Sequence, residues 1–482
     1  MTLQSGKKTG NATASSRGRH FGAPLIIVAL MFSALSVTAA RATTLLDPRP
    51  EPATEQFGRA MAVIGDVDHD GVPDLAVGAP FQDGDFLGTP GFGKPQNPGK
   101  VWVLSGATLT VLFTMDDPKY QVEGATPQFG GQLGFSVSAI ADINGDGVPD
   151  IIAGAPHEVP GDFNAGTGII NAGRAFAFSG ADGSVLLTLD DPTQQEGGLL
   201  GYAVAGLGDV NNDGVPDIAV GVPGKNIGDE SQGLIAVGLV YIFSGADGSL
   251  IRTLNHPTQE VNARFGSAVA NAGDIDHDGV SDIVIGAPGR SEAFVFSGRT
   301  GALIFSITSP VIEQEHSFGT AVAGGKDLDG DGTPDFAVGA PLQKNSRGAV
   351  FVYNGSDGTL RRKLRVMAPQ EFARFGAAIY LSDDLTGDGR PDILVGVPDQ
   401  DVNGVINAGE VLIFNGANGR LFQTLTSAAP QDSADFGSAI VTADFNGDGT
   451  PTPVIGTPYE SADLIVHGDS EHHIAIGQIE IQ

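Results

Sequence analysis

The chain has 482 residues, of which only 17% are charged, and its formal net charge at pH 7 is −31. Such an acidic chain is not expected to bind nucleic acid or an anionic membrane surface, because both carry negative charge. The sequence contains no cysteine, which excludes disulfide bonds as a source of stability.

The first 42 residues have the layout of a secretory signal peptide. Residues 1–20 contain four basic residues and no acidic one, residues 21–40 are mainly apolar, and small residues follow at Ala39, Ala40 and Ala42. A membrane anchor is the alternative, since about 20 apolar residues can span a bilayer, but the small residues favour cleavage. In both cases we expect residues 43–482 to lie outside the cytoplasm, secreted or at the cell surface or in a periplasm. We do not expect the mature chain to be inserted in a membrane.

An aspartate-rich loop recurs seven times, and its clearest copy is Asp327-x-Asp329-x-Asp331-Gly332-x-x-Asp335. Carboxylates at positions 1, 3, 5 and 9 of a tight loop can converge on one ion, and the glycine at position 6 allows the sharp turn. Oxygen-only ligands in a flexible loop favour Ca²⁺ over Mg²⁺. The first half of this spacing matches the EF-hand loop, but the flanking segments are short and lack a helical period, which predicts that the loop joins two strands.

The candidate metal ligands occupy positions 1, 3, 5 and 9 of the seven loops, which predicts up to seven Ca²⁺ ions. An ion-free turn is the alternative for a single copy. We expect the firmest sites in the three loops that begin at Asp66, Asp274 and Asp327, which have four carboxylates, and the weakest in the seventh loop, which has Thr452 at position 9. In chain order the candidates are Asp66, Asp68, Asp70 and Asp74; Asp142, Asn144, Asp146 and Asp150; Asp209, Asn211, Asp213 and Asp217; Asp274, Asp276, Asp278 and Asp282; Asp327, Asp329, Asp331 and Asp335; Asp384, Thr386, Asp388 and Asp392; and Asp444, Asn446 and Asp448.

Each repeat is expected to contain four short strands. Two apolar segments flank the aspartate-rich loop, a β-rich segment follows a variable polar loop, and a Gly/Asp turn leads into a fourth segment that ends near a proline. Four-stranded antiparallel units repeated in this way form the blades of a β-propeller. The expected third strands include residues 100–104, 174–178, 239–243, 349–353 and 410–414.

These repeats resemble FG-GAP repeats, the family that forms the seven-bladed propeller at the N-terminus of integrin α subunits. The resemblance rests on Phe-Gly at Phe57, Phe265, Phe318, Phe375 and Phe436, Leu-Gly at Leu133 and Leu200, and Gly-x-Pro at Gly78, Gly154, Gly221, Gly286, Gly339, Gly396 and Gly456. It implies that each Ca²⁺ loop joins the first two strands of a blade, on the face opposite the usual ligand surface. The chain departs from integrins in carrying a cation-type loop in all seven units.

The fold class expected from the repeats and this resemblance is all-β. We expect residues 43–482 to form a seven-bladed β-propeller of FG-GAP repeats, with four antiparallel strands per blade. The last unit ends near residue 481 without a fourth strand, and residues 43–48 resemble the fourth-strand ends of other units. An N-terminal strand is therefore expected to complete the last blade and to remove an open sheet edge. A linker left by signal cleavage is the alternative.

Two classes of function are compatible with the sequence. The first is a calcium-binding adhesion or interaction module for an extracellular protein or glycan. Its partner surface is expected in the long loops at residues 81–99, 157–173 and 224–238, on the face away from the Ca²⁺ loops. The second is a polysaccharide-acting enzyme. The pairs Asp116-Asp117 and Asp190-Asp191 could suggest glycosidase carboxylates, but both precede a proline at the same place in the repeat, so no catalytic residue is assigned.

Overall fold

The computed structural model describes residues 43–46, 56–82, 97–121, 130–161, 167–228, 235–311, 317–366, 370–459 and 478–481. Residues 41–482 form one compact unit. The expected signal peptide, residues 1–42, lies outside the described residues, as do parts of the three long loops. In the described part of the chain, no helix has the length and apolar character needed to cross a membrane.

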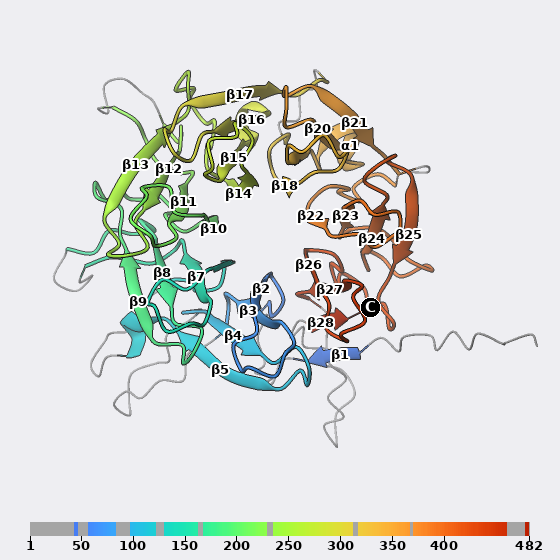
Figure 1. Ribbon diagram of the computed structural model, residues 1–482, viewed down its shortest axis with the longest axis horizontal. Helices are drawn as coiled ribbons and strands as arrows, with labels where there is room; N and C mark the ends of the chain where they lie inside the picture. Colours follow the sequence, from blue (N-terminus) through green and yellow to red (C-terminus); the bar gives the residue numbers. More distant parts are fainter. Residues whose placement is uncertain are drawn as a thin grey trace, which may run out of the picture. The chain divides into compact units, whose positions relative to one another are not determined.

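Six four-stranded antiparallel sheets are each formed by four consecutive strands of the described chain (Figure 1). The strands are β2 (Ala60–Gly65), β3 (Asp74–Ala79), β4 (Lys100–Leu104) and β5 (Val111–Asp116); β6 (Ser136–Ile140), β7 (Asp150–Ala155), β8 (Arg174–Phe178) and β9 (Val185–Leu189); β10 (Val204–Gly206), β11 (Ile218–Val222), β12 (Leu239–Phe243) and β13 (Leu250–Asn255); β14 (Ala268–Gly273), β15 (Asp282–Ala287), β16 (Glu292–Phe296) and β17 (Leu303–Thr308); β18 (Val322–Lys326), β19 (Asp335–Gly339), β20 (Val350–Tyr353) and β21 (Leu360–Leu364); and β22 (Ile379–Ser382), β23 (Asp392–Val397), β24 (Glu410–Phe414) and β25 (Leu421–Leu425).

A further sheet combines both ends of the chain, in the order β1 (Thr43–Leu46), β28 (Gln478–Ile481), β27 (Thr452–Thr457) and β26 (Ala439–Ala443). Strand β1 pairs antiparallel with β28, with Thr43 opposite Ile481 and Leu46 opposite Gln478. The pairing of residues 43–46 with the last strand is the one expected from the sequence. The sequence predicts seven blades in all, and six sheets are built from consecutive strands alone. These six sheets do not by themselves confirm the blade count.

Burial in each sheet follows the position of the strand. The second and third strands are covered on both faces, so that every residue of β3 and β4 is buried, and they read as short continuous apolar segments. The fourth strands are more exposed at their start, as in β5 and β9. The all-β propeller of four-stranded blades is therefore confirmed, including the third strands expected from the β-rich segments.

The Phe-Gly and Gly-x-Pro motifs meet between neighbouring sheets. A Cβ atom added to Gly78 would lie 2.1 Å from the carbonyl oxygen of Gly134, which belongs to the Leu-Gly of the next unit. Only glycine allows the two backbones to approach this closely. The same approach joins Gly456 to Gly58, at the two ends of the repeat array. The Phe-Gly phenylalanines are buried beside these contacts, and Phe57 packs edge-on against Trp102.

Candidate metal centre

Each of the seven aspartate-rich loops joins the first two strands of a sheet, as the sequence predicts. The aspartate at position 1 organises the loop by accepting a hydrogen bond from the backbone N–H of the glycine at position 6. In the fifth loop, residues 327–335, Gly332 N donates to Asp327 Oδ2 at 2.9 Å. Gly332 has φ +91° and nothing lies within 4 Å of an added Cβ, so glycine is required by the backbone conformation rather than by lack of space.

The aspartate at position 9 is buried in the first six loops, where it connects the loop to the rest of the sheet. In the first loop, residues 66–74, Asp74 Oδ2 accepts a hydrogen bond of 2.7 Å from Val67 N, and Asp74 Oδ1 accepts one of 2.8 Å from Gly106 N. Gly106 lies in the turn between β4 and β5. Burial raises the pKa of Asp74, although the hydrogen bonds from Gly106 and Val67 act in the opposite direction.

Burial raises the pKa of the aspartate at position 9 most strongly in the fourth and fifth loops. It raises the pKa of Asp282 to about 6 and that of Asp335 to about 6. Both groups accept hydrogen bonds from backbone N–H groups, which favour the charged form, but desolvation outweighs them. A divalent cation beside these carboxylates would favour the ionised form, because ligation requires it.

Three loops bring three carboxylates together, and they are the three that carry four acidic ligand positions. Oxygens of Asp66, Asp68 and Asp70 lie within 4.8 Å of one another in the first loop. In the fourth and fifth loops, residues 274–282 and 327–335, the clustered groups are those at positions 1, 3 and 9: Asp274, Asp276 and Asp282, and Asp327, Asp329 and Asp335. Asp74, Asp278 and Asp331 complete the sets expected from the sequence but lie outside these groups of three.

The other four loops hold no group of three acidic oxygens among their described residues. Their third position is Asn144, Asn211, Thr386 or Asn446 instead of aspartate. Asn144 Nδ2 donates to Asp146 Oδ2 at 2.9 Å, and Asn211 Nδ2 donates to Asp213 Oδ2 at 2.8 Å. The remaining ligand positions of these loops are Asp142, Asp150, Asp209, Asp217, Asp384, Asp388, Asp392, Asp444 and Asp448.

The donor set of the clustered loops suits a hard cation. All donors are carboxylate oxygens, and three negative charges at this separation repel one another unless a cation lies between them. The clustered residues, at positions 1, 3 and 5 in the first loop and at positions 1, 3 and 9 in the fourth and fifth, therefore fit Ca²⁺ on the chemistry of their donors.

Sequence reasoning missed the contribution of the turn after each third strand. The amide of Asn415 donates to Asp388 Oδ2 at 2.5 Å, and Ser244 Oγ donates to Asp213 Oδ2 at 3.4 Å. These polar residues begin the turns that the sequence shows as Ser-Gly-Ala-Asp-Gly or a variant. The recurrence of this turn in step with the aspartate loop was the signal that could have linked the two.

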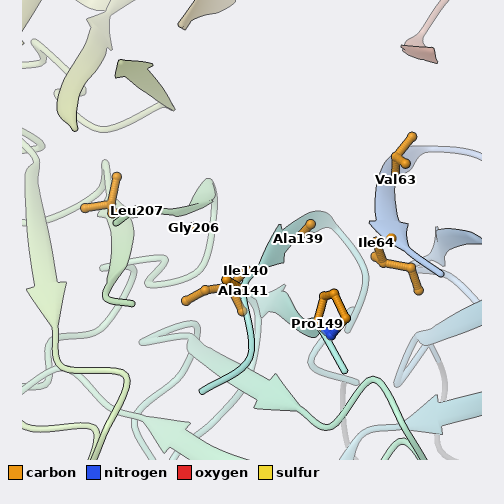
Figure 2. A pocket seen from close by; sticks show the side chains of 9 residues that line it. Val63, Ile64, Ala139, Ile140, Ala141, Pro149, Gly206 and Leu207 are labelled. Atoms are coloured by element: carbon orange, nitrogen blue, oxygen red, sulfur yellow. The ribbon is translucent and has the colours of Figure 1, made fainter. Parts of the chain in front are cut away.

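A cavity of about 270 Å³ lies between the first strands of three neighbouring sheets, close to where the first two aspartate loops begin (Figure 2). The side chains that line it are apolar and include Val63, Ile64, Ala139, Ile140 and Leu207. Pro149 also lines it, and none of the candidate metal ligands does. The cavity therefore adds no chemistry to the metal sites.

The paired aspartates before the prolines have structural roles between sheets. Asp191 is fully buried and forms an ion pair of 2.5 Å with Lys225 of the next sheet unit, and it accepts a hydrogen bond from Tyr241. At the preceding boundary, Asp117 is buried beside Glu158, and Lys119 lies 3.2 Å from Glu158. Asp117 and Asp191 each accept a hydrogen bond from the N–H two residues later, which agrees with the expectation that the pairs belong to turns.

Comparison with known families agrees with the geometry. The FG-GAP repeat model matches residues 57–104, 133–170, 200–237, 265–304 and 318–353, and the FG-GAP-like repeat model matches residues 384–451. The chain is an FG-GAP repeat protein.

The relatives of this FG-GAP repeat protein include integrin α chains. It is 30% identical over 279 residues to integrin alpha pat-2 of Caenorhabditis briggsae, and the matched segment covers 54% of this chain and 21% of the relative. It is 32% identical over 223 residues to integrin alpha-5 of Xenopus laevis, with 43% and 20% covered, and 30% identical over 253 residues to integrin alpha-V of Gallus gallus, with 49% and 23% covered. The FG-GAP repeat protein thus resembles the integrin α propeller, and the matched part spans about a fifth of the length of these relatives.

Proposed function

We propose that this FG-GAP repeat protein is an extracellular, calcium-binding adhesion or interaction module for a protein or glycan partner. The observation that supports it is the convergence of three carboxylates within 4.8 Å in each of three loops, on a propeller that resembles that of integrin α. A loop that repeats at the same place in every unit is best explained by a shared role, and a shared ligand is the simplest one.

The proposal includes a single domain of seven blades at residues 43–482, preceded by a signal peptide at residues 1–42. The first strands support the count of seven, since β2 contacts β6, and the same contact continues through β10, β14, β18 and β22 to β26, which contacts β2. The close approach of Gly456 to Gly58 and the pairing of β1 with β28 support the same closure. Secretion would be tested by N-terminal sequencing of the chain recovered from the extracellular fraction, where a start near Thr43 is expected and an intact Met1 would contradict cleavage.

Bound Ca²⁺ would supply positive charge that offsets the repulsion between the carboxylates of the loop. The chain's residues divide the work: position 1 shapes the turn, positions 3 and 5 face solvent and provide exchangeable oxygens, and the buried position 9 fixes the loop to the sheet. Binding to the folded state then stabilises the blade by mass action. We propose that up to seven ions bind, most firmly in the first, fourth and fifth loops.

We place the partner surface on the side of the sheets opposite these loops. The connections from the second to the third strand emerge there, and in the first three units they are long: residues 81–99, 157–173 and 224–238. Variable loops on a rigid scaffold are where binding usually resides, and the first of them contains Phe81, Phe86 and Phe92.

Binding would be tested with the full chain on a glycan array and on a panel of purified extracellular proteins, each with Ca²⁺ and with EGTA. A partner is expected in one of the two sets, and its binding should be lost when residues 81–99 are shortened to a tight turn while the Ca²⁺ content and melting temperature stay unchanged. Unaltered affinity of the shortened chain would contradict this surface. The chain would also be incubated with a panel of polysaccharides, where new reducing ends would show an enzyme instead.

A further inference from the structure

The fifth aspartate loop has a mostly buried arginine beside two of its clustered carboxylates. The Arg361 guanidinium, whose side chain is only 11% exposed, lies with Nη1 3.3 Å from Asp335 Oδ2 and with Nε 3.9 Å from Asp329 Oδ2. Both aspartates belong to the group of three that would hold an ion. The positive charge therefore lies against the oxygens that a cation would use.

The position of Arg361 is fixed by a β-bulge. Tyr353 pairs with Leu360 and Val352 pairs with Arg362, so Arg361 is the extra residue between two ladder positions. Bulges direct a side chain away from the regular alternation of the strand. Nη2 of Arg361 also donates to the carbonyl oxygens of Leu328, at 3.1 Å, and Ala417, at 3.4 Å, so the guanidinium is held in place from the loop itself and from the neighbouring sheet.

The other five consecutive-strand sheets have the same bulge but an apolar residue on it. In the first sheet, Val103 pairs with Phe113 and Leu104 with Val111, which leaves Leu112 as the bulged residue. The registers of the remaining four sheets likewise leave Leu186, Ile251, Ile304 and Phe422. Since Leu112 belongs to the sheet of the first loop, which also has four carboxylates, the chain contains a natural comparison for Arg361.

The fourth loop shows that a nearby arginine is not enough. Arg299 lies with Nε 3.3 Å from Asp278 Oδ2, but its side chain is 45% exposed and Asp278 is outside the group of three carboxylates. Solvent screens an exposed pair of this kind. Only in the fifth loop, among the described loops, does a mostly buried cation contact two of the clustered carboxylates.

We propose that Arg361 is an internal counter-cation of the fifth loop, which keeps this loop folded without an ion and lowers its affinity for Ca²⁺ below that of the first loop. The inference rests on the proposed function and refines it, because it predicts different Ca²⁺ affinities for two loops that carry aspartate at the same four positions. Ca²⁺ must either share the carboxylates with the guanidinium or displace it, and a unit charge at this distance opposes a divalent ion by an amount equivalent to roughly tenfold or more in affinity.

The test is Ca²⁺ titration calorimetry on the full chain after chelation, with three single variants, two of which are also made in a background that lacks the aspartate at position 1. Arg361→Leu, which installs the residue of the first sheet, should tighten one site by roughly tenfold or more, and this gain should vanish in an Asp327→Ala background. The reciprocal Leu112→Arg should weaken one site, and that loss should vanish in an Asp66→Ala background. Arg361→Gln keeps a polar side chain and replaces Arg361→Leu in the test if that variant does not fold. It should tighten the same site.

Thermal unfolding in EGTA provides a second readout. Arg361→Leu should melt at a lower temperature than the unaltered chain in EGTA and should gain more from added Ca²⁺, because its carboxylates have lost their counter-charge. If the unaltered chain binds Ca²⁺ but the Arg361→Leu and Arg361→Gln titrations superimpose on its own or show weaker binding, the inference is overturned and the proposed function stands. If neither the unaltered chain nor the variants bind Ca²⁺, the proposed function is overturned as well.

Discussion

Asp74 Oδ1 accepts a hydrogen bond of 2.8 Å from Gly106 N, which ties the loop between β2 and β3 to the turn between β4 and β5. The same bond recurs in the next five sheets, for example between Asp150 and Gly180. The aspartate at position 9 therefore has a structural role that does not depend on an ion, whereas the exposed Asp68 at position 3 of the first loop accepts a hydrogen bond from Asp70 N inside the loop.

This difference predicts opposite outcomes for two substitutions in the first loop. Asp74→Ala should lower the free energy of unfolding by about 2–4 kcal/mol even in EGTA, because it leaves the buried N–H groups of Val67 and Gly106 without an acceptor. Asp68→Ala should cost less than about 0.5 kcal/mol in EGTA but should remove about one bound ion. Urea unfolding with and without Ca²⁺ measures both, and equal losses in EGTA would contradict the division of roles.

The buried acid pair at the first sheet boundary predicts a dependence of stability on pH. Burial, together with the neighbouring Glu158, raises the pKa of Asp117 well above its usual range, against the smaller opposing effect of Lys119. The folded state therefore favours the protonated form, so this group's contribution to stability is present below about pH 3.8 and is lost as the pH rises through the raised pKa.

Asp117→Asn isolates that contribution because asparagine does not ionise. We expect the free energy of unfolding of the unaltered chain, minus that of the variant, to fall in EGTA as the pH rises above about 4 toward the raised pKa of Asp117. Urea unfolding at several pH values measures this difference. A difference that stays flat, or that grows with pH, would show that Asp117 is ionised in the folded chain at no cost.

At the next sheet boundary, a buried aspartate forms an ion pair with a buried lysine. Removing this lysine is predicted to lower the stability of the fold strongly. Lys225 and Asp191 have side chains that are only 7% and 0% exposed. Lys225→Met should lower the free energy of unfolding by about 3–5 kcal/mol, because it leaves a buried carboxylate without its counter-charge. Adding Asp191→Asn should recover part of the loss, and a loss that is unchanged in this double variant would contradict the explanation.

Much of the fold can be predicted from the sequence because the same pattern of strands, loop and turn recurs in each repeat. The third strands, the placement of the loops between strands and the pairing of residues 43–46 with the chain's end were all expected from local patterns. The ion pair of Lys225 with Asp191 and the contact of Arg361 with Asp335 could not be expected in the same way. Each joins residues from different strands or sheets, and only the register of the sheets and their packing bring these residues together.

The pairing of the chain's ends predicts a local loss of protection. Deleting residues 43–46 removes the partner of β28, so the backbone N–H groups of Gln478–Ile481 that face β1 should exchange with solvent much faster. Hydrogen exchange measured by mass spectrometry should show this change in residues 478–481 and little change in β14 or β15. Unaltered exchange at residues 478–481 would show that β1 is not needed to protect the last sheet.

The most direct test of a calcium-binding propeller is to count bound ions and measure the melting temperature of the same full-length sample. The chain would be stripped with EGTA, titrated with Ca²⁺, and followed by native mass spectrometry and scanning calorimetry. We predict that several ions bind, up to seven, and that the melting temperature rises with Ca²⁺ and falls again with EGTA, since an ion at 100 times its Kd adds about 2.7 kcal/mol per site. A chain that binds no Ca²⁺ and melts at the same temperature in Ca²⁺ and in EGTA would contradict the account.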